Sequence, residues 1–329
     1  MPKYKPSSVN TVTISSSVLL SLIKHTSEHY PALFSGALLG FEDESLIDIT
    51  HVFPFPYPDQ YEGGSFKSRS GSQYQKELLE NFKKLGYGVE FQGYFQSSIS
   101  GNFATSQLID GLAQQQLLNP NAFILVHNMS SEGQELDLKA VRLSSGFMNG
   151  YIDGKWKSRD LEKNKVSYLN IFDKLELEIQ NQALVDLYLT SNNKQATPSE
   201  AQSEFKSLDL LSNSGSTTHL LESLCSQVDS FNYDQNNFNY YQRQYQKEQS
   251  KIQQWKQQRK YENLERSKKG EEELSTDEWK SIFRLPQEPS RYNNMLQSHS
   301  IHVLAEDVLK KCDEELQKSF AINRKLTAE

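Results

Sequence analysis

The chain has 329 residues, a net charge of −7 and a mean hydropathy of −0.68. This length allows about two domains, and the low hydropathy predicts that part of the chain forms polar helices or loops. The longest apolar run, residues 122–126, is far shorter than the ~20 residues of a membrane span. Two cysteines and an N-terminus without an apolar leader predict a reduced, cytoplasmic protein. The acidic balance excludes a protein that coats nucleic acid through its overall charge.

The first half of the chain mixes predicted strands with predicted helices. Alternating or short apolar runs predict seven strands, at residues 10–15, 32–41, 45–53, 89–95, 122–126, 136–143 and 175–180. Apolar residues at helical spacing predict helices that begin near residues 17, 74, 107 and 183. The segment 59–72 is rich in Gly, Ser and charged residues, a composition that predicts a loop. Helices placed among strands indicate an α+β fold, with a mixed sheet flanked by helices.

The second half reads as polar helices after a linker at residues 191–218. Residues 240–269 carry nine Lys or Arg, three Glu and only a sparse apolar stripe, so this helix must lie on a partner or bridge solvent. His299 and His302 are expected on the surface. The last helix has one apolar stripe at spacings of three or four, formed by Ile301, Leu304, Val308, Cys312, Leu316 and Phe320.

Several short motifs, in this order and spacing, resemble those of MPN domains. They are residues 36–40 (GALLG), 53–56 (FPFP), 93–98 (GYFQSS) and 136–143. The basic, Gln-rich stretch from Tyr240 and the sequence IFRLPQEPSR at 282–291 extend this likeness over most of the chain. With them, the chain resembles the non-catalytic MPN-domain family of eukaryotic translation initiation factor 3.

Active MPN proteins are zinc isopeptidases, and the resemblance assigns their motif to four positions here. Their general-base Glu corresponds to Leu33, their two zinc-binding His to Gln96 and Ser98, and their zinc-binding Asp to Ile109. An amide and a hydroxyl are poor zinc ligands, and Leu33 cannot transfer a proton. Asp110 follows the Asp position, but one residue on a helix is a rotation of about 100°. We therefore expect no metal, no cofactor and no hydrolase activity.

The resemblance implies a division of the chain into an MPN core at 8–150 and an extension with a closing strand and short helix at 151–195. A linker at 196–218 would follow, and then C-terminal helices at 219–329 that join a multi-subunit bundle. The stripe of the last helix would meet partner helices there.

By the same resemblance, the chain is a non-catalytic scaffold that supports assembly of the initiation factor and its binding to the small ribosomal subunit. Its partners would be other subunits of the factor, including a second MPN subunit, the f subunit by family analogy. Two alternatives stay open: a non-catalytic MPN subunit of the proteasome lid or signalosome, and, against the motif comparison, a metal-dependent isopeptidase.

The basic, Gln-rich stretch has two interpretations. Lys256, Arg259 and Lys260 could form a face near ribosomal RNA, because basic residues at helical spacing neutralise phosphates. The simpler interpretation, which is favoured, is a solvated helix face, since charge runs are usually only solvated.

Overall fold

The computed structural model describes residues 4–5, 9–29, 33–43, 45–55, 69–99, 101–129, 136–193, 214–270, 272, 274–275 and 277–326. All seven predicted strands are present, with ends shifted by a few residues. They are β1 Thr11–Ser15, β2 Ser35–Glu42, β3 Leu46–Pro54, β4 Glu90–Ser98, β5 Phe123–Asn128, β6 Leu138–Leu143 and β7 Phe172–Gln180.

The seven strands form one mixed sheet in the order β1-β3-β2-β4-β5-β6-β7, which closes because β1 pairs with both β3 and β7. The pairs β1–β3, β1–β7 and β4–β5 are parallel, and the other four pairs are antiparallel. This arrangement confirms the mixed sheet of the expected α+β fold. Strand β4 lies between β2 and β5, where neighbouring strands cover both of its edges.

Alternate residues of the strands belong to two separate apolar clusters. On β4 and β5, Phe95 and Leu125 belong to the cluster that includes residues of α1 Ser16–His29. Tyr94 and Val126 belong to the other cluster, which α3 Arg69–Lys84 and α4 Ser106–Leu118 cover. Because successive side chains of a strand point to opposite faces, this division follows directly from the sequence. The sheet therefore lies between helices, as predicted.

Two glycines allow the central strands to approach each other closely. A Cβ at Gly93 on β4 would lie 2.1 Å from the carbonyl oxygen of Phe123 on β5. A Cβ at Gly40 on β2 would lie 1.9 Å from the carbonyl oxygen of Asp48 on β3. Any side chain at either position would push the neighbouring strand away.

Three shorter helices accompany the last strands of the sheet. Helices α5 Ser145–Asp153 and α6 Ser158–Asn164 lie between β6 and β7, and neither was predicted from the sequence. The side chain of Ser144 caps α5 by accepting from the Phe147 N–H at 3.3 Å, and Gly154 ends it with a positive φ of 62°. Helix α7 Ala183–Asn193 occurs where a short helix was expected, with several leucines exposed.

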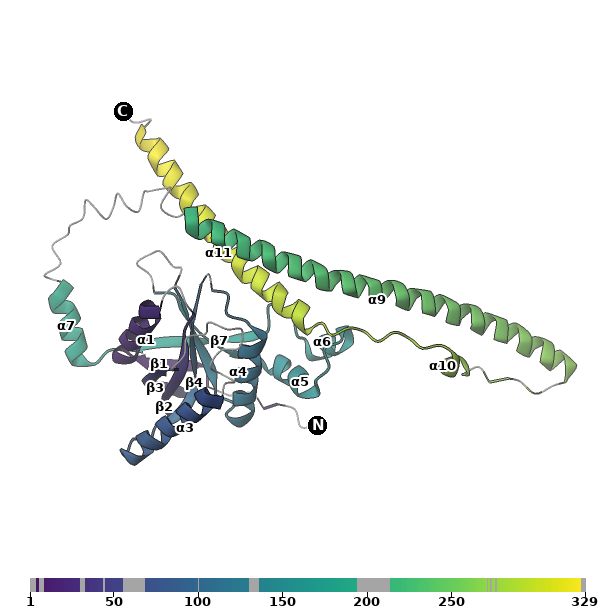
Figure 1. The fold of residues 1–329 in the computed structure, drawn as a ribbon, viewed down its shortest axis with the longest axis horizontal. Helices are drawn as coiled ribbons and strands as arrows, with labels where there is room; N and C mark the ends of the chain where they lie inside the picture. The colour runs from purple at the N-terminus through teal and green to yellow at the C-terminus, as the bar shows by residue number, and fades with distance from the viewer. Residues whose placement is uncertain are drawn as a thin grey trace.

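The C-terminal part is a long helical arm (Figure 1). Helix α9 Ser214–Lys269 is one continuous helix of 56 residues, followed by the short α10 Trp279–Ile282 and by α11 Tyr292–Leu326. Figure 1 shows α11 crossing the start of α9, while the rest of α9 extends away from the sheet. Among the described helices, none has both the length and the apolar content that crossing a bilayer requires.

Two predicted irregular segments are partly helical. Residues 69–72, expected in a loop, form the first turn of α3, and the rest of the expected loop from 59 lies outside the described residues. Residues 191–193 end α7 and residues 214–218 begin α9, so the linker predicted at 191–218 is too long at both ends. In each case polar residues, which suggested a loop, extend a helix whose stability comes from its neighbouring turns.

Candidate functional site

The positions that correspond to the zinc motif come together on one side of the sheet. Gln96 and Ser98 alternate with Phe95 and Ser97, so they share the face of β4 that carries Tyr94. Ile109 of α4 is fully buried in the cluster that covers this face. Leu33 comes just before Phe34, whose N–H donates to the Ser97 Oγ at 2.6 Å at the end of β4. The positions that the resemblance assigns to the motif therefore lie near this end of β4, and that they are replaced motif positions stays a prediction.

The groups at these positions offer little to a metal ion. Gln96 and Ser98 are buried, and neither the Gln96 Oε1 nor the Ser98 Oγ has a hydrogen-bond partner in the described structure. The apolar side chains of Leu33 and Ile109 supply no ligand and no base. Throughout the described ranges, no cluster of three or more His, Cys, Asp or Glu is placed to hold a metal. An amide oxygen and a hydroxyl alone do not make the imidazole and carboxylate set that zinc sites use.

Asp110, the carboxylate next to the motif position, is engaged elsewhere. It hydrogen-bonds to the Tyr151 hydroxyl of α5. Burial, and then the Asp110 charge, raises the pKa of Tyr151 above its usual value. Asp110 therefore faces α5, while the adjacent Ile109 lies in the core, as expected from the rotation of one residue along a helix.

The start of α11 packs on the part of the chain formed by strands β1 to β7 and helices α1 to α6, which we call the sheet domain. Met295 and Leu296 are buried in the same apolar cluster as Ile109 and Phe147. His299 donates its Nδ1–H to the carbonyl oxygen of Tyr168 at 3.0 Å. Its ring also lies 5.4 Å from the Phe172 ring and 6.5 Å from the Phe103 ring, measured between centroids. The predicted surface position is therefore wrong for His299, which is half-buried, and burial lowers its pKa.

The apolar stripe of α11 divides into two parts. Leu304 is 1% exposed, and Ile301 and Val308 are half-buried within the chain, so this part already has an intramolecular partner, with α9 packed against α11. Leu304 is therefore no longer expected at a partner interface. The second part is exposed, with Leu316 at 55% and Phe320 at 71%, and Cys312 is exposed too. For these three residues, partner contact stays a prediction.

A polar junction joins the sheet domain to both long helices, and it was not predicted from the sequence. The Glu288 carboxylate accepts from the Ser158 N–H of α6 at 2.9 Å, and the Arg291 Nη1 donates to the Ser158 Oγ at 3.3 Å. The Arg291 N–H donates to the carbonyl oxygen of Trp156 at 2.9 Å, and its guanidinium lies 3.9 Å from the Phe238 ring of α9. The prolines at 286 and 289, on either side of Glu288, were the available signal for a fixed, extended segment.

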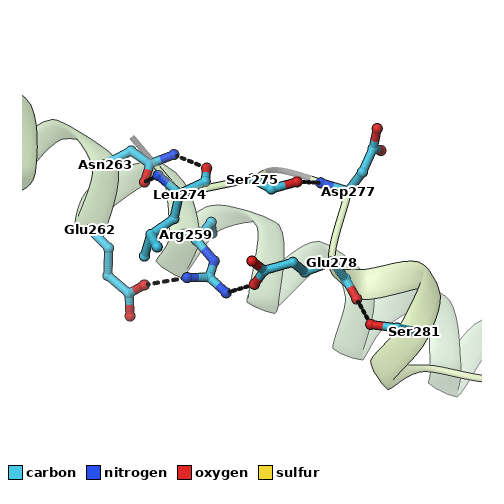
Figure 2. A network of polar contacts seen from close by, with 8 residues as sticks. All are labelled: Arg259, Glu262, Asn263, Leu274, Ser275, Asp277, Glu278 and Ser281. Carbon is cyan, nitrogen blue, oxygen red and sulfur yellow. Dashed lines mark hydrogen bonds and ion pairs between the residues drawn. The ribbon is translucent and has the colours of Figure 1, made fainter. Parts of the chain in front are cut away.

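Figure 2 shows how the segment after α9 folds back onto it. The side chain of Asn263 donates to the Leu274 carbonyl oxygen at 2.9 Å and accepts from the Leu274 N–H at 3.0 Å (Figure 2). Arg259 forms ion pairs with Glu262, at 3.6 Å, and with Glu278 (Figure 2). The returning segment therefore runs antiparallel along α9.

Two of the three residues expected near RNA already make contacts within the chain. The Arg259 side chain is only 15% exposed, and two carboxylates and the Trp255 ring at 4.7 Å already surround its guanidinium. The Lys256 ammonium lies 4.5 Å from the Trp279 ring of α10. Lys260 is exposed. A single basic face built from these three residues is therefore not what the geometry favours, although RNA contact by Lys260 stays a prediction.

Similarity to known protein families covers nearly the whole chain. The family described as the C-terminal region of eIF3h matches residues 131–327, and the JAB1/Mov34/MPN/PAD-1 ubiquitin protease family matches residues 7–121.

Full-length relatives agree with both matches. The H subunit of eukaryotic translation initiation factor 3 from Yarrowia lipolytica is 33% identical, over 96% of this chain and 97% of its own length. The proteins with the same name in Pyricularia oryzae and Aspergillus terreus are each 29% identical, over 99% and 97% of this chain and 99% and 96% of their own lengths. The chain carries an MPN domain and belongs to the family of H subunits of eukaryotic translation initiation factor 3.

Proposed function

We propose that this chain is a non-catalytic scaffold subunit of translation initiation factor 3, which supports assembly of the factor and its binding to the small ribosomal subunit in the cytoplasm. The observation that carries the proposal is the second half of α11. There, Leu309, Leu316 and Phe320 are exposed on a helix whose first half is packed. Leucine and phenylalanine presented at helical spacing fit a groove between partner helices, which would complete a bundle.

The sheet domain would pair with a second MPN subunit, the f subunit by family analogy. Leu85 and Tyr87, both exposed and two residues apart after α3, support such a contact. An exposed apolar surface on a folded domain is a common mark of a protein interface.

Catalysis is not part of the proposed role, because the motif positions lack the groups that isopeptidase chemistry needs. A zinc-bound water requires at least three protein ligands and an open position. Gln96 and Ser98 present one amide oxygen and one hydroxyl, and Ile109 closes the third position with carbon. Metal analysis of the purified chain, together with a ubiquitin-chain cleavage assay, tests this directly. Stoichiometric zinc with cleavage would contradict it.

Affinity purification of the tagged chain from its own cells, followed by mass spectrometry, tests the scaffold role. We expect subunits of translation initiation factor 3, including a second MPN subunit, together with proteins of the small ribosomal subunit. Recovery of proteasome-lid or signalosome subunits without initiation-factor subunits would contradict the proposal. The match of the family's C-terminal region to residues 131–327 argues against those assemblies.

A further inference from the structure

Helix α9 has two faces that differ sharply in burial from residue 238 onward. At spacings of three and four, one set of positions is buried or half-buried, including Tyr241, Tyr245, Ile252, Arg259 and Asn263. The returning segment 274–291 contacts this inner side, through the pairs Asn263–Leu274, Arg259–Glu278 and Phe238–Arg291. The inner side of α9 therefore faces a later part of the same chain.

The opposite side of α9 is exposed at every position. We call it the outer face, and it consists of Tyr240, Arg243, Lys247, Lys251, Gln254 and Gln258. Their spacings of three, four, four, three and four keep them on one side of the helix. The outer face lies on the part of α9 that extends away from the sheet domain in Figure 1, so the domain does not cover it.

The chemistry of the outer face favours phosphate over protein. It has three basic residues, no acidic residue and no aliphatic residue, whereas the cores of protein interfaces are apolar and depleted of charge. Glu248, next to this face, pairs with Lys251 at 2.7 Å, but the Lys251 side chain remains 59% exposed, whereas that of Arg259 is 15% exposed. Residues 240–261 contain six basic residues and one acidic residue, a net charge of +5 in a chain of net charge −7. Gln and Tyr, which fill the remaining positions, also hydrogen-bond to phosphate and sugar oxygens.

We propose that the outer face of α9 binds the phosphate backbone of RNA without sequence preference, through Arg243, Lys247 and Lys251. These three side chains follow one another along about 12 Å of helix axis. The site differs from the set Lys256, Arg259 and Lys260, because Arg259 is paired with Glu262 and Glu278, and Lys256 lies against Trp279. The inference goes beyond the scaffold role and does not depend on which subunits hold α11.

The test is binding of the purified full-length chain to a fluorescein-labelled single-stranded RNA of mixed sequence, across a series of KCl concentrations. The variant replaces all three residues by the glutamine that already surrounds them: Arg243→Gln, Lys247→Gln and Lys251→Gln. We expect its affinity at low salt to fall by about tenfold or more. The slope of log K against log [KCl] should decrease in magnitude by about 2, because each lost phosphate contact contributes roughly 0.7 for a single strand.

A matched control removes the same charge from the sheet domain, through Lys76→Gln, Lys83→Gln and Lys84→Gln on the exposed side of α3. We expect this control to bind RNA within twofold of the parent. Equal loss in both triple variants would overturn the inference in favour of a bulk-charge effect, and so would undiminished binding by the α9 variant. Absence of RNA binding by the parent, with loss of a protein partner by the α9 variant in affinity purification, would overturn it in favour of a protein contact.

Purification of initiation-factor subunits with the α9 variant separates this inference from the scaffold role. If RNA binding is lost and the subunits are still recovered, the outer face contacts RNA and the scaffold role stands by itself. Recovery of no initiation-factor subunits with the parent would contradict the scaffold role and leave the RNA measurement to decide the inference alone.

Discussion

Glutamine side chains are buried at β4 and α4, and they differ in their hydrogen bonds. Gln92, at 1% exposure, has neither its Nε2 nor its Oε1 hydrogen-bonded in the described structure. Gln116 is equally buried and its Oε1 is also unpaired in the described structure, but its Nε2 donates to the carbonyl oxygen of Ala122 at 3.0 Å. An unpaired buried amide costs about 1–3 kcal/mol, whereas a paired one contributes to stability. Similar glutamines should therefore respond in opposite ways to replacement.

Replacing Gln92 by Met should raise the free energy of unfolding by about 1 kcal/mol, because Met fills a similar volume without an unpaired amide. The matched control Gln116→Met should lower it, since the Ala122 carbonyl oxygen would lose its donor. Urea denaturation of the three proteins, followed by circular dichroism, measures both changes. A loss of stability in Gln92→Met as large as that in Gln116→Met would show that Gln92 is hydrogen-bonded.

We expect His299 to make the docking of α11 sensitive to pH. Burial lowers the pKa of His299 from its usual value of 6.5, and His302 nearby lowers it further, while the Tyr168 carbonyl and Glu306 oppose the shift. The unfolded chain therefore takes up the proton more readily than the folded chain. The stabilising effect is complete above about pH 6.5 and is lost as the pH falls through the unfolded pKa toward the lower folded pKa.

The variant His299→Phe should be less sensitive to acid than the parent, because Phe keeps a ring beside Phe103 and Phe172 but cannot be protonated. The measurement is the difference in melting temperature between pH 7.5 and pH 5.5 for both proteins. We expect a smaller difference in the variant, even if the loss of the hydrogen bond to Tyr168 lowers its stability at both pH values. An equal or larger difference would remove His299 as the cause.

Helix α11 combines two roles along its length. Its first half, with Met295, Leu296 and Leu304 buried, completes the core of this chain. Its second half exposes Leu316 and Phe320. The first half therefore anchors the helix, and the second half is presented at a fixed position.

Truncating the side chains of the two halves should separate stability from assembly. Leu304→Ala should lower the free energy of unfolding of the isolated chain by about 2–5 kcal/mol, as for other large-to-small changes in a core. The double variant Leu316→Ala, Phe320→Ala should change it by less than about 1 kcal/mol, because surface substitutions have small effects.

Thermal denaturation of the chain alone, and co-purification with initiation-factor subunits, test the two halves together. The double variant should recover fewer subunits than the parent at unchanged melting temperature. Unchanged recovery would exclude the second half of α11 as a partner surface.

Arg259 holds the returning segment against α9 through its ion pair with Glu278. Its guanidinium also pairs with Glu262 and lies against the Trp255 ring. Arg259→Gln should therefore loosen residues 274–283, and hydrogen exchange of these amides should become faster while that of β4 stays the same. Arg243→Gln, an identical change on the outer face, should leave the exchange of residues 274–283 unaltered. Slow exchange in the Arg259 variant would mean that Asn263 and Trp279 suffice to hold the segment.

At the scale of the whole molecule, periodicity predicted the sheet well and the helical arm less well. The seven strands have alternating or continuous apolar runs, which can be read from local sequence. Gly93 marks the close approach of β4 to β5, and Pro54 marks the end of β3. Residues 240–269 were predicted as a helix, but the continuity of α9 from Ser214 was missed, because residues 229–239 are Asp, Asn, Gln, Ser and aromatic residues with no aliphatic residue at helical spacing. Helix α5 was missed although Ser144 and Gly154 were readable cap signals.

The candidate site, too, could be predicted from the sequence only in part. The replacement of motif residues was inferred from the resemblance and stays a prediction; of those positions, Gln96 and Ser98 share one face of β4, which α4 with Ile109 covers. By contrast, the engagement of Arg259 by Glu278, and the junction at Glu288 and Arg291, depend on long-range contacts that sequence spacing does not contain. The division between buried Leu304 and exposed Phe320 also needed the position of α9 and the sheet domain.

Native mass spectrometry of the assembly purified through this tagged chain tests its role as a non-catalytic scaffold most directly. We expect an assembly that contains one copy of this chain, one second MPN subunit and further subunits of translation initiation factor 3, with no zinc assigned to this chain. A chain that is recovered alone, or with proteasome-lid or signalosome subunits in place of initiation-factor subunits, or with one bound zinc ion per copy, would contradict it.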